Sequence, residues 1–423
     1  MRPKLKKAVQ NDFIKNVTKL ASGTMAAQII AFITIPILTR TYSQEAFGLL
    51  AVFSAAVGFI SSFATLKYDT ALVLPKEDRH AYALLKLSNI VTVLITAACV
   101  AFMFLPIPYF ESYRGLQVFI GIGVLLSVNY NNSALWNIRY KCFNHTAIST
   151  VVQSIAVFTF QYLLYKYFEL KGLVIGSLIG IAISGIYLIY TRKSDWRIYR
   201  QISKKDMLEQ GKRYIDFPKY FTASNAILSF SSSLPIFLFV KYIPMAQIGI
   251  YGIALKIISQ PVTLIANSIR SVILADMAER KNKNKPILKW YLKIFVGLFL
   301  LSLIAALGLI SFGDFIVTLF LGKEWVEAAL YAKMLIPLLI GMMIASPGIA
   351  AVRVFEMQKY NFNYSLVSLA FKLITLLGLF IWGVVAFEYI ILIYALISLA
   401  LIIGNNSIIL VKIKKYEKQI TTI

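Results

Sequence analysis

Residues 390–410 read IILIYALISLALIIGNNSIIL and contain no charged side chain. At a rise of about 1.5 Å per residue, a helix of this length spans about 30 Å, the thickness of the hydrocarbon core of a bilayer. Similar apolar blocks occupy residues 29–38 and 91–105. Membrane-spanning strands would instead need short segments of alternating polarity, which the sequence lacks. These blocks predict an all-α integral membrane protein.

The composition of the 423-residue chain agrees with that class, because 59% of its residues are hydrophobic and only 15% are charged. Soluble domains carry about 25% charged residues. The net charge is +24, from 43 Lys and Arg against 19 Asp and Glu. The bases lie between the apolar blocks, as the positive-inside rule requires, so we expect no nucleic-acid partner.

We expect about twelve transmembrane helices, each near the length needed to cross a membrane. Basic loops alternate with loops poor in bases, which predicts an even number of spans and both termini in the cytoplasm. The polar stretch 191–218 divides the chain into a predicted N-terminal lobe (1–191), a cytoplasmic linker (192–218) and a C-terminal lobe (219–423). The predicted spans are residues 16–38, 47–73, 84–105, 115–136, 148–167, 172–191, 219–240, 249–274, 289–311, 328–351, 363–382 and 388–411.

The two halves of the sequence resemble each other. Pro36 is followed by EAFGL at 45–49, and Pro235 is followed by AQIGI at 246–250, which aligns Gly48 with Gly249. Shorter matches pair residues 66–67 with 269–270 and residues 137–139 with 351–353. Such a repeat predicts two six-helix bundles related by a pseudo-two-fold axis along the membrane normal. Pro36 and Pro235 are candidate hinges, because proline breaks a backbone hydrogen bond of its helix.

Basic residues within or beside the apolar blocks are candidates for binding an anionic substrate. A charge at the centre of a membrane costs about 2.5–3.5 kcal/mol on insertion scales, so it faces a cavity or a partner unless it reaches the headgroups. For Lys256 and Lys372 we favour a cavity, whereas for residues nearer the span ends both explanations stay open. The candidates for a cationic cavity are Lys256, Lys372, Arg270, Arg139, Arg353, Lys67 and Arg40.

Acids and catalytic motifs are scarce. Asp69 is a candidate for binding a coupling ion, although an interfacial salt bridge with a base from another span is the simpler interpretation. The two histidines, His80 and His145, lie in no metal-binding or catalytic pattern, and the sequence contains no phosphate-binding loop and no nucleophile elbow. We therefore expect a protein that is not an enzyme and that uses no cofactor and no metal.

Four stretches carry a family resemblance: IPILTR at 35–40, EAFGL at 45–49, LKYDTALVLP at 66–75 and FLGKEW at 320–325. They resemble the O-antigen and polysaccharide flippases of the multidrug/oligosaccharidyl-lipid/polysaccharide exporter superfamily. The resemblance implies a V-shaped pair of bundles around a cationic cavity in the bacterial inner membrane. It also implies ion-coupled, alternating-access movement of undecaprenyl-pyrophosphate-linked oligosaccharide to the periplasmic leaflet. The implied partners are this substrate, membrane lipids, and a polysaccharide polymerase with its chain-length machinery.

Two other functions stay open. A cation-coupled drug or metabolite antiporter of the same superfamily would need acids deep in the membrane, and the sequence offers few. A membrane-embedded polysaccharide polymerase would need a sizeable periplasmic loop, whereas the loops near 106–114 and 312–327 are short.

Overall fold

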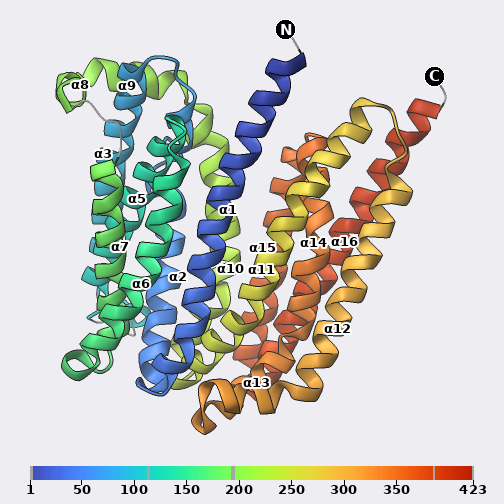
Figure 1. Cartoon of the computed structure of the whole chain (residues 1–423). Helices are drawn as coiled ribbons and strands as arrows, with labels where there is room; N and C mark the ends of the chain where they lie inside the picture. Colours follow the sequence, from blue (N-terminus) through green and yellow to red (C-terminus); the bar gives the residue numbers. More distant parts are fainter. Residues whose placement is uncertain (1–2, 112–114, 192–195, 384–385, 422–423) are drawn as a thin grey trace. The chain divides into compact units, whose positions relative to one another are not determined.

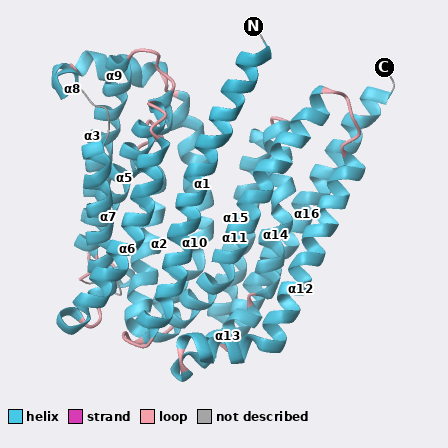
Figure 2. Ribbon diagram, in the orientation of Figure 1, coloured by secondary structure: helices cyan, strands magenta, loops and turns pink. Residues whose placement is uncertain are grey.

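The computed structural model describes residues 3–111, 115–191, 196–383 and 386–421. Over these residues the chain is helical and contains no strand (Figures 1 and 2). Among the described helices, 12 are long and apolar enough to cross a membrane. The predicted all-α membrane fold and its number of spans are therefore confirmed. Residues 192–195, the first part of the predicted linker, lie outside the described residues.

The described helices divide into two compact units, Met1–Lys241 and Tyr242–Ile423. The helices of the first unit are α1 (Pro3–Thr39), α2 (Gln44–Ala64), η1 (Thr70–Val73), α3 (Asp78–Met103), α4 (Pro108–Glu111), α5 (Gln117–Arg139), α6 (Phe143–Phe168), α7 (Gly172–Thr191), α8 (Trp196–Gln201), α9 (Lys204–Arg213), η2 (Phe217–Thr222) and α10 (Ala223–Tyr242). Those of the second are α11 (Met245–Asn282), α12 (Leu288–Leu321), η3 (Lys323–Trp325), α13 (Val326–Met334), α14 (Ile336–Val354), α15 (Gln358–Trp382) and α16 (Phe387–Thr421).

The seventh span, α10, groups with the first unit, whereas the sequence analysis assigned it to the second lobe. Its side chains explain the grouping. The Phe59 ring on α2 lies 5.2 Å from the Phe230 ring and 5.8 Å from the Phe237 ring. The Tyr109 hydroxyl also donates a hydrogen bond of 2.8 Å to the Phe237 carbonyl. These contacts attach α10 to the helices that precede the linker.

Glycines on α7 allow it to pack directly against the backbone of α6. Gly172, Gly176 and Gly180 recur every four residues and so share one face of the helix. A Cβ atom added at Gly176 would lie 2.5 Å from the backbone nitrogen of Gln161, and one at Gly180 would lie 2.7 Å from the backbone nitrogen of Val157. Close approach through small residues is a common way to hold membrane helices together.

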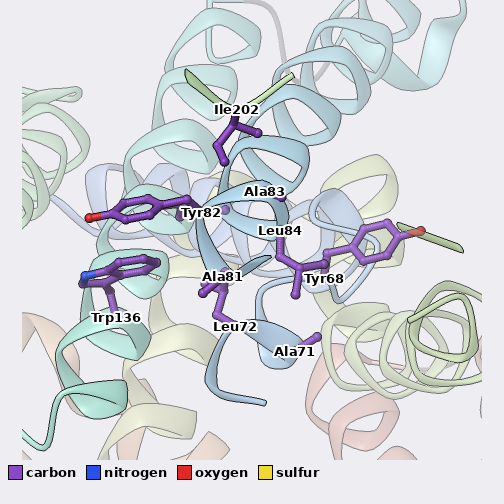
Figure 3. Close-up of a cluster of buried hydrophobic side chains, with 10 residues drawn as sticks. Tyr68, Ala71, Leu72, Ala81, Tyr82, Ala83, Leu84, Trp136 and Ile202 are labelled. Carbon is purple, nitrogen blue, oxygen red and sulfur yellow. The ribbon is translucent and has the colours of Figure 1, made fainter. Parts of the chain in front are cut away.

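A buried cluster fixes the linker to one end of the first unit (Figure 3). Ile202, from the segment between α8 and α9, inserts among apolar residues of η1, α3 and α5. Two hydrogen bonds also hold the linker: Lys86 Nζ donates to the Ile202 carbonyl at 2.9 Å, and the Tyr68 hydroxyl donates to the carbonyl of Gly211 in α9 at 3.2 Å. The described part of the linker, from residue 196 on, is thus part of the folded unit. The cluster comprises Tyr68, Ala71, Leu72, Ala81, Tyr82, Ala83, Leu84, Leu85, Trp136 and Ile202.

Two predicted spans are not single continuous helices in the structure. The apolar run 47–73 was predicted as one span, but α2 ends at Ala64 and the chain turns through Leu66 and Lys67, whose φ angles are 47° and 57°. The rest of the run is apolar because it packs in the buried cluster rather than against lipid. The run 328–351 is divided between α13 and α14, since Pro337 lies in the first turn of α14 and cannot continue a preceding helix.

The internal repeat is visible in matching helix ends. The helix α2 begins at Gln44 and α11 at Met245, a separation of 245 − 44 = 201 that also separates Gly48 from Gly249. The helices α5 and α14 both end in a turn with one left-handed residue, Lys141 (φ 59°) and Glu356 (φ 53°). These residues are 356 − 141 = 215 positions apart, so Arg139 corresponds to Val354 in the turn. The predicted match of 137–139 with 351–353 is therefore wrong by one residue.

Candidate functional site: basic side chains within the spans

Lys256 and Lys372 lie well inside two spans of the second unit. Lys372 is 382 − 372 = 10 residues from the end of α15, or about 15 Å along the axis, and Lys256 is 11 residues from the start of α11, or about 16 Å. Both side chains are half-buried. Neither ammonium has a hydrogen bond or an ion pair with any residue that the structure describes. A charge without an ionic partner at such a depth is costly, so both lysines stay candidates for binding an anionic group.

Lys372 makes a cation–π contact with an aromatic side chain. Its Nζ atom lies 5.5 Å from the centre of the Tyr394 ring on α16. At this distance the face of the ring attracts the cation. Tyr394 is only 5% exposed, so its position is fixed by the surrounding helices. The contact orients the ammonium group and leaves its hydrogen-bond donors available.

Arg270 on α11 and Arg353 at the end of α14 form a second cationic group in the same unit. The two guanidinium groups are close enough to interact electrostatically. The Nε atom of Arg270 is buried and has no acceptor among the described residues. Two like charges near each other repel, so an anion placed beside them would be stabilised by both. This pair is therefore a candidate for binding phosphate or another acidic group.

Arg139 has a different environment from the cations of the second unit. Its guanidinium donates to the Pro75 carbonyl at 2.5 Å and forms an ion pair with Asp78 at 3.0 Å. The side chain is 9% exposed. The Tyr140 hydroxyl donates to the other carboxylate oxygen of Asp78 at 2.6 Å, and burial together with this bond raises the pKa of Tyr140. Arg139 thus closes the segment between α2 and α3 onto the end of α5.

Arg40 and Lys67 lie in turns of the first unit. Arg40 is exposed between α1 and α2. Lys67 is half-buried at the left-handed turn after α2, where its backbone N–H donates to the Thr65 hydroxyl at 3.1 Å. Together with Arg139, these two residues belong to a different unit from Lys256, Lys372, Arg270 and Arg353, and each unit must be considered separately as a site.

Asp69 is a buried carboxylate with neutral partners. It is 3% exposed and accepts hydrogen bonds from the Thr65 hydroxyl at 2.8 Å and the Asn131 amide at 3.1 Å. No basic side chain of the described residues lies within salt-bridge distance. The simpler sequence interpretation, an interfacial salt bridge, is therefore wrong. Among the described residues, the Asp69 carboxylate is thus held by one hydroxyl and one amide donor.

The sequence analysis missed Tyr394 and Pro261. Tyrosines of membrane proteins concentrate at span ends, whereas Tyr394 stands inside the apolar run 390–410, and this unusual depth was the available signal. Pro261 lies inside α11, between Lys256 and Arg270. It has no backbone N–H, so the carbonyl of Ile257 loses its usual helical donor. Pro36 and Pro235 also lie inside helices, α1 and α10.

The 12 apolar helices of the described residues define a multi-pass membrane protein. A model of the polysaccharide biosynthesis protein family matches residues 37–330, which is more than half of the chain. The chain therefore belongs to the polysaccharide biosynthesis protein family. This confirms the family resemblance recognised in the four sequence stretches.

One characterised relative and two solved structures extend the comparison. The chain is 25% identical over 136 residues to the teichuronic acid biosynthesis protein TuaB of Bacillus subtilis, an alignment that covers 31% of this chain and 28% of that protein. Lipid II flippase MurJ in an inward closed conformation matches with a TM-score of 0.71 and 14% identity, over 94% of this chain and 90% of that one. An inward-facing MATE family multidrug transporter of the MOP superfamily matches with a TM-score of 0.56 and 12% identity, over 95% of both chains. These likenesses show that the chain shares the fold of these two proteins.

Proposed function

We propose that this protein is a flippase that moves an undecaprenyl-pyrophosphate-linked oligosaccharide, an O-antigen or capsule repeat unit, from the cytoplasmic to the periplasmic leaflet of the inner membrane. The protein would do so by alternating access. The family concerns polysaccharide biosynthesis, and the fold is shared with a protein named as a lipid II flippase. Both findings support a transporter whose substrate is a sugar carried on a lipid.

The observation that carries the proposal is the pair of uncompensated lysines inside the spans. Lys256 and Lys372 have no acidic partner among the described residues, whereas an antiporter for organic cations would need carboxylates at that depth. A pyrophosphate group carries the opposite charge and can accept hydrogen bonds from ammonium donors. Arg270 and Arg353 add a second cationic position in the same unit.

Charge reversal in a deletion strain of the source bacterium tests this function. Lys256→Glu and Lys372→Glu should each abolish complementation, and complete repeat units on undecaprenyl pyrophosphate should accumulate on the cytoplasmic side. Lys359→Glu is the matched control, because Lys359 is an exposed base at the first turn of the same helix, α15. It should complement like the wild type. Mass spectrometry of the lipid-linked sugars, with leaflet accessibility measured on the same cells, gives the result.

The same experiment has two contradicting outcomes. If complete repeat units reach the periplasm normally in the deletion strain, the protein is not their flippase, and drug efflux and polymerisation become the functions to assay. If the strain accumulates the units but both Glu variants restore export, the flippase function stands and the lysine site is rejected.

Asp69 is our candidate for coupling transport to an ion. Its carboxylate is buried against Thr65 and Asn131, at the turn that connects α2 with the buried cluster. Protonation would remove its charge and weaken both hydrogen bonds, which links ion binding to the shape of this turn. Asp69→Asn keeps the size of the side chain. It should make export insensitive to collapse of the proton gradient, and export that remains as sensitive as in the wild type would reject this role.

A further inference from the structure

A polar stripe runs along one face of α11, between Lys256 and Arg270. Position 256 is followed by polar residues at 260, 263 and 270, which are Gln, Thr and Arg. At about 100° per residue, these four positions fall within an arc of about 80°. The stripe is about 21 Å long, since 270 − 256 = 14 residues of rise separate its ends. Polar residues with helical spacing inside a membrane span indicate a face that is kept away from lipid.

The exposed apolar side chains of α11 lie on the other side of the helix. Ile265 is 41% exposed and Val272 is 67% exposed. Both positions are about 160–180° from the middle of the stripe. The stripe residues Lys256, Gln260, Thr263 and Arg270 are each half-buried. The two faces of α11 therefore differ in the way that a helix between lipid and a polar ligand requires.

The stripe offers hydrogen-bonding groups that the protein itself does not use. Gln260 Oε1 and Arg270 Nε are buried, and neither has a partner among the described residues. The Thr263 hydroxyl donates to the Gln260 carbonyl at 3.0 Å, so its oxygen is left to accept. Buried polar atoms without partners are costly, and natural proteins keep them where a ligand or water completes the bonds.

We propose that this stripe of α11 binds the sugar portion of the lipid-linked substrate. The inference rests on the proposed flippase function and adds the residues that recognise the sugar. The cations at positions 256 and 270 suit the phosphates, while Gln260 Oε1 and the Thr263 oxygen suit the hydroxyl and amide donors of a sugar. Sugar units would thus find acceptors along α11 between the two cationic ends.

Three near-isosteric variants on α11 test the inference. Gln260→Leu and Thr263→Val remove the acceptors and retain much of the shape. Ser268→Ala is the matched control, because Ser268 is exposed about 120° from the stripe and its hydroxyl only donates to the Leu264 carbonyl at 2.9 Å. Native mass spectrometry of the purified protein measures binding of two lipids: the lipid-linked repeat unit extracted from the source bacterium, and bare undecaprenyl pyrophosphate.

We expect Gln260→Leu and Thr263→Val each to bind the glycosylated lipid about two- to tenfold more weakly, the effect of one lost hydrogen bond. Their binding of the bare lipid, and both affinities of Ser268→Ala, should equal those of the wild type. Unchanged binding of the glycosylated lipid, or an equal loss for both lipids, would overturn the sugar site and leave the flippase function intact. A wild-type protein that binds neither lipid would overturn both proposals.

Discussion

Arg139 and Lys256 show that basic residues beside similar apolar runs have different roles. Arg139 donates to the Pro75 carbonyl and pairs with Asp78, so its charge stabilises the fold. Lys256 has no such partner among the described residues. The sequence could locate both charges but could not separate them, because the partner of Arg139 is backbone from a loop more than sixty residues away. The path of the chain between α2 and α3 brings the Pro75 carbonyl and Asp78 to Arg139, and the sequence alone does not reveal that path.

Removing the Arg139 side chain should destabilise the first unit. Arg139→Ala leaves the Pro75 carbonyl and Asp78 without their charged donor, and hydrogen bonds to charged groups contribute about 1.5–3 kcal/mol. Arg79→Ala is the control, because Arg79 pairs with Asp206 at 3.2 Å but is 59% exposed, and such surface pairs contribute about 0–1 kcal/mol. The thermal midpoints of the purified variants, measured by size-exclusion chromatography after heating, compare their stabilities. Equal losses in the two variants would contradict the assigned role of Arg139.

The Asp206 carboxylate gives a pH dependence in the acid range. Its pKa is lowered from 3.8 to about 2 by hydrogen bonds from the backbone and hydroxyl of Ser203 and from Arg79. Because the pKa is lower in the folded protein, this group contributes stability above about pH 4 and loses it as the pH falls towards 2. The difference in thermal midpoint between the wild type and Asp206→Asn should therefore shrink from pH 6 to pH 2.5. A constant difference would show that Asp206 does not titrate as its contacts imply.

At the scale of helices, the sequence predicted where apolar runs lie better than where helices end. The limits of α7 coincide with the predicted span 172–191. Gly172 begins the apolar run, and the basic residues Arg192 and Lys193 follow its end, so both limits are visible in the sequence. The end of α2 was missed, because the apolar run continues into η1, where it serves the buried cluster. Hydrophobicity alone does not distinguish contact with lipid from contact with other helices.

The packing of α7 on α6 gives a matched pair of glycine variants. Gly180→Ala should destabilise the first unit by about 1–3 kcal/mol, since the added methyl group meets the Val157 backbone and forces the helices apart. Gly185 lies on the same helix, and a Cβ atom added there would have no atom within 4 Å, so Gly185→Ala should be neutral or stabilising. Midpoints of thermal unfolding in detergent measure both variants. A Gly180→Ala protein as stable as Gly185→Ala would show that α6 and α7 are less closely packed than described.

At the scale of the whole chain, the repeat and the number of spans followed from the sequence, and the structure adds a grouping of the helices into Met1–Lys241 and Tyr242–Ile423. The spacing of 201 residues between Gly48 and Gly249 holds at the starts of α2 and α11. The seventh span joins the first unit because Phe230 and Phe237 of α10 pack on Phe59 of α2. Aromatic contacts between distant segments leave no periodic signal, so no pattern along the sequence could have predicted this grouping.

The orientation of the chain in the membrane is the remaining whole-molecule prediction. The 34 residues of α12 extend about 51 Å, well beyond the hydrocarbon core, so its two ends emerge on opposite sides. Basic residues flank the end near Asn284, so we expect that turn and Lys205 of the linker to lie in the cytoplasm, and Lys323 to lie on the periplasmic side. Single cysteines at these three positions, in a chain with Cys99 and Cys142 replaced by serine, test the orientation.

A membrane-impermeant maleimide should label Asn284→Cys and Lys205→Cys only in inside-out vesicles. It should label Lys323→Cys only in right-side-out vesicles. Reversed labelling at all three positions would invert the orientation and place the basic linker outside the cell. Labelling of positions 284 and 323 from the same side would mean that α12 does not cross the membrane. In that case the even number of spans, and with it a cytoplasmic position for both termini, would have to be abandoned.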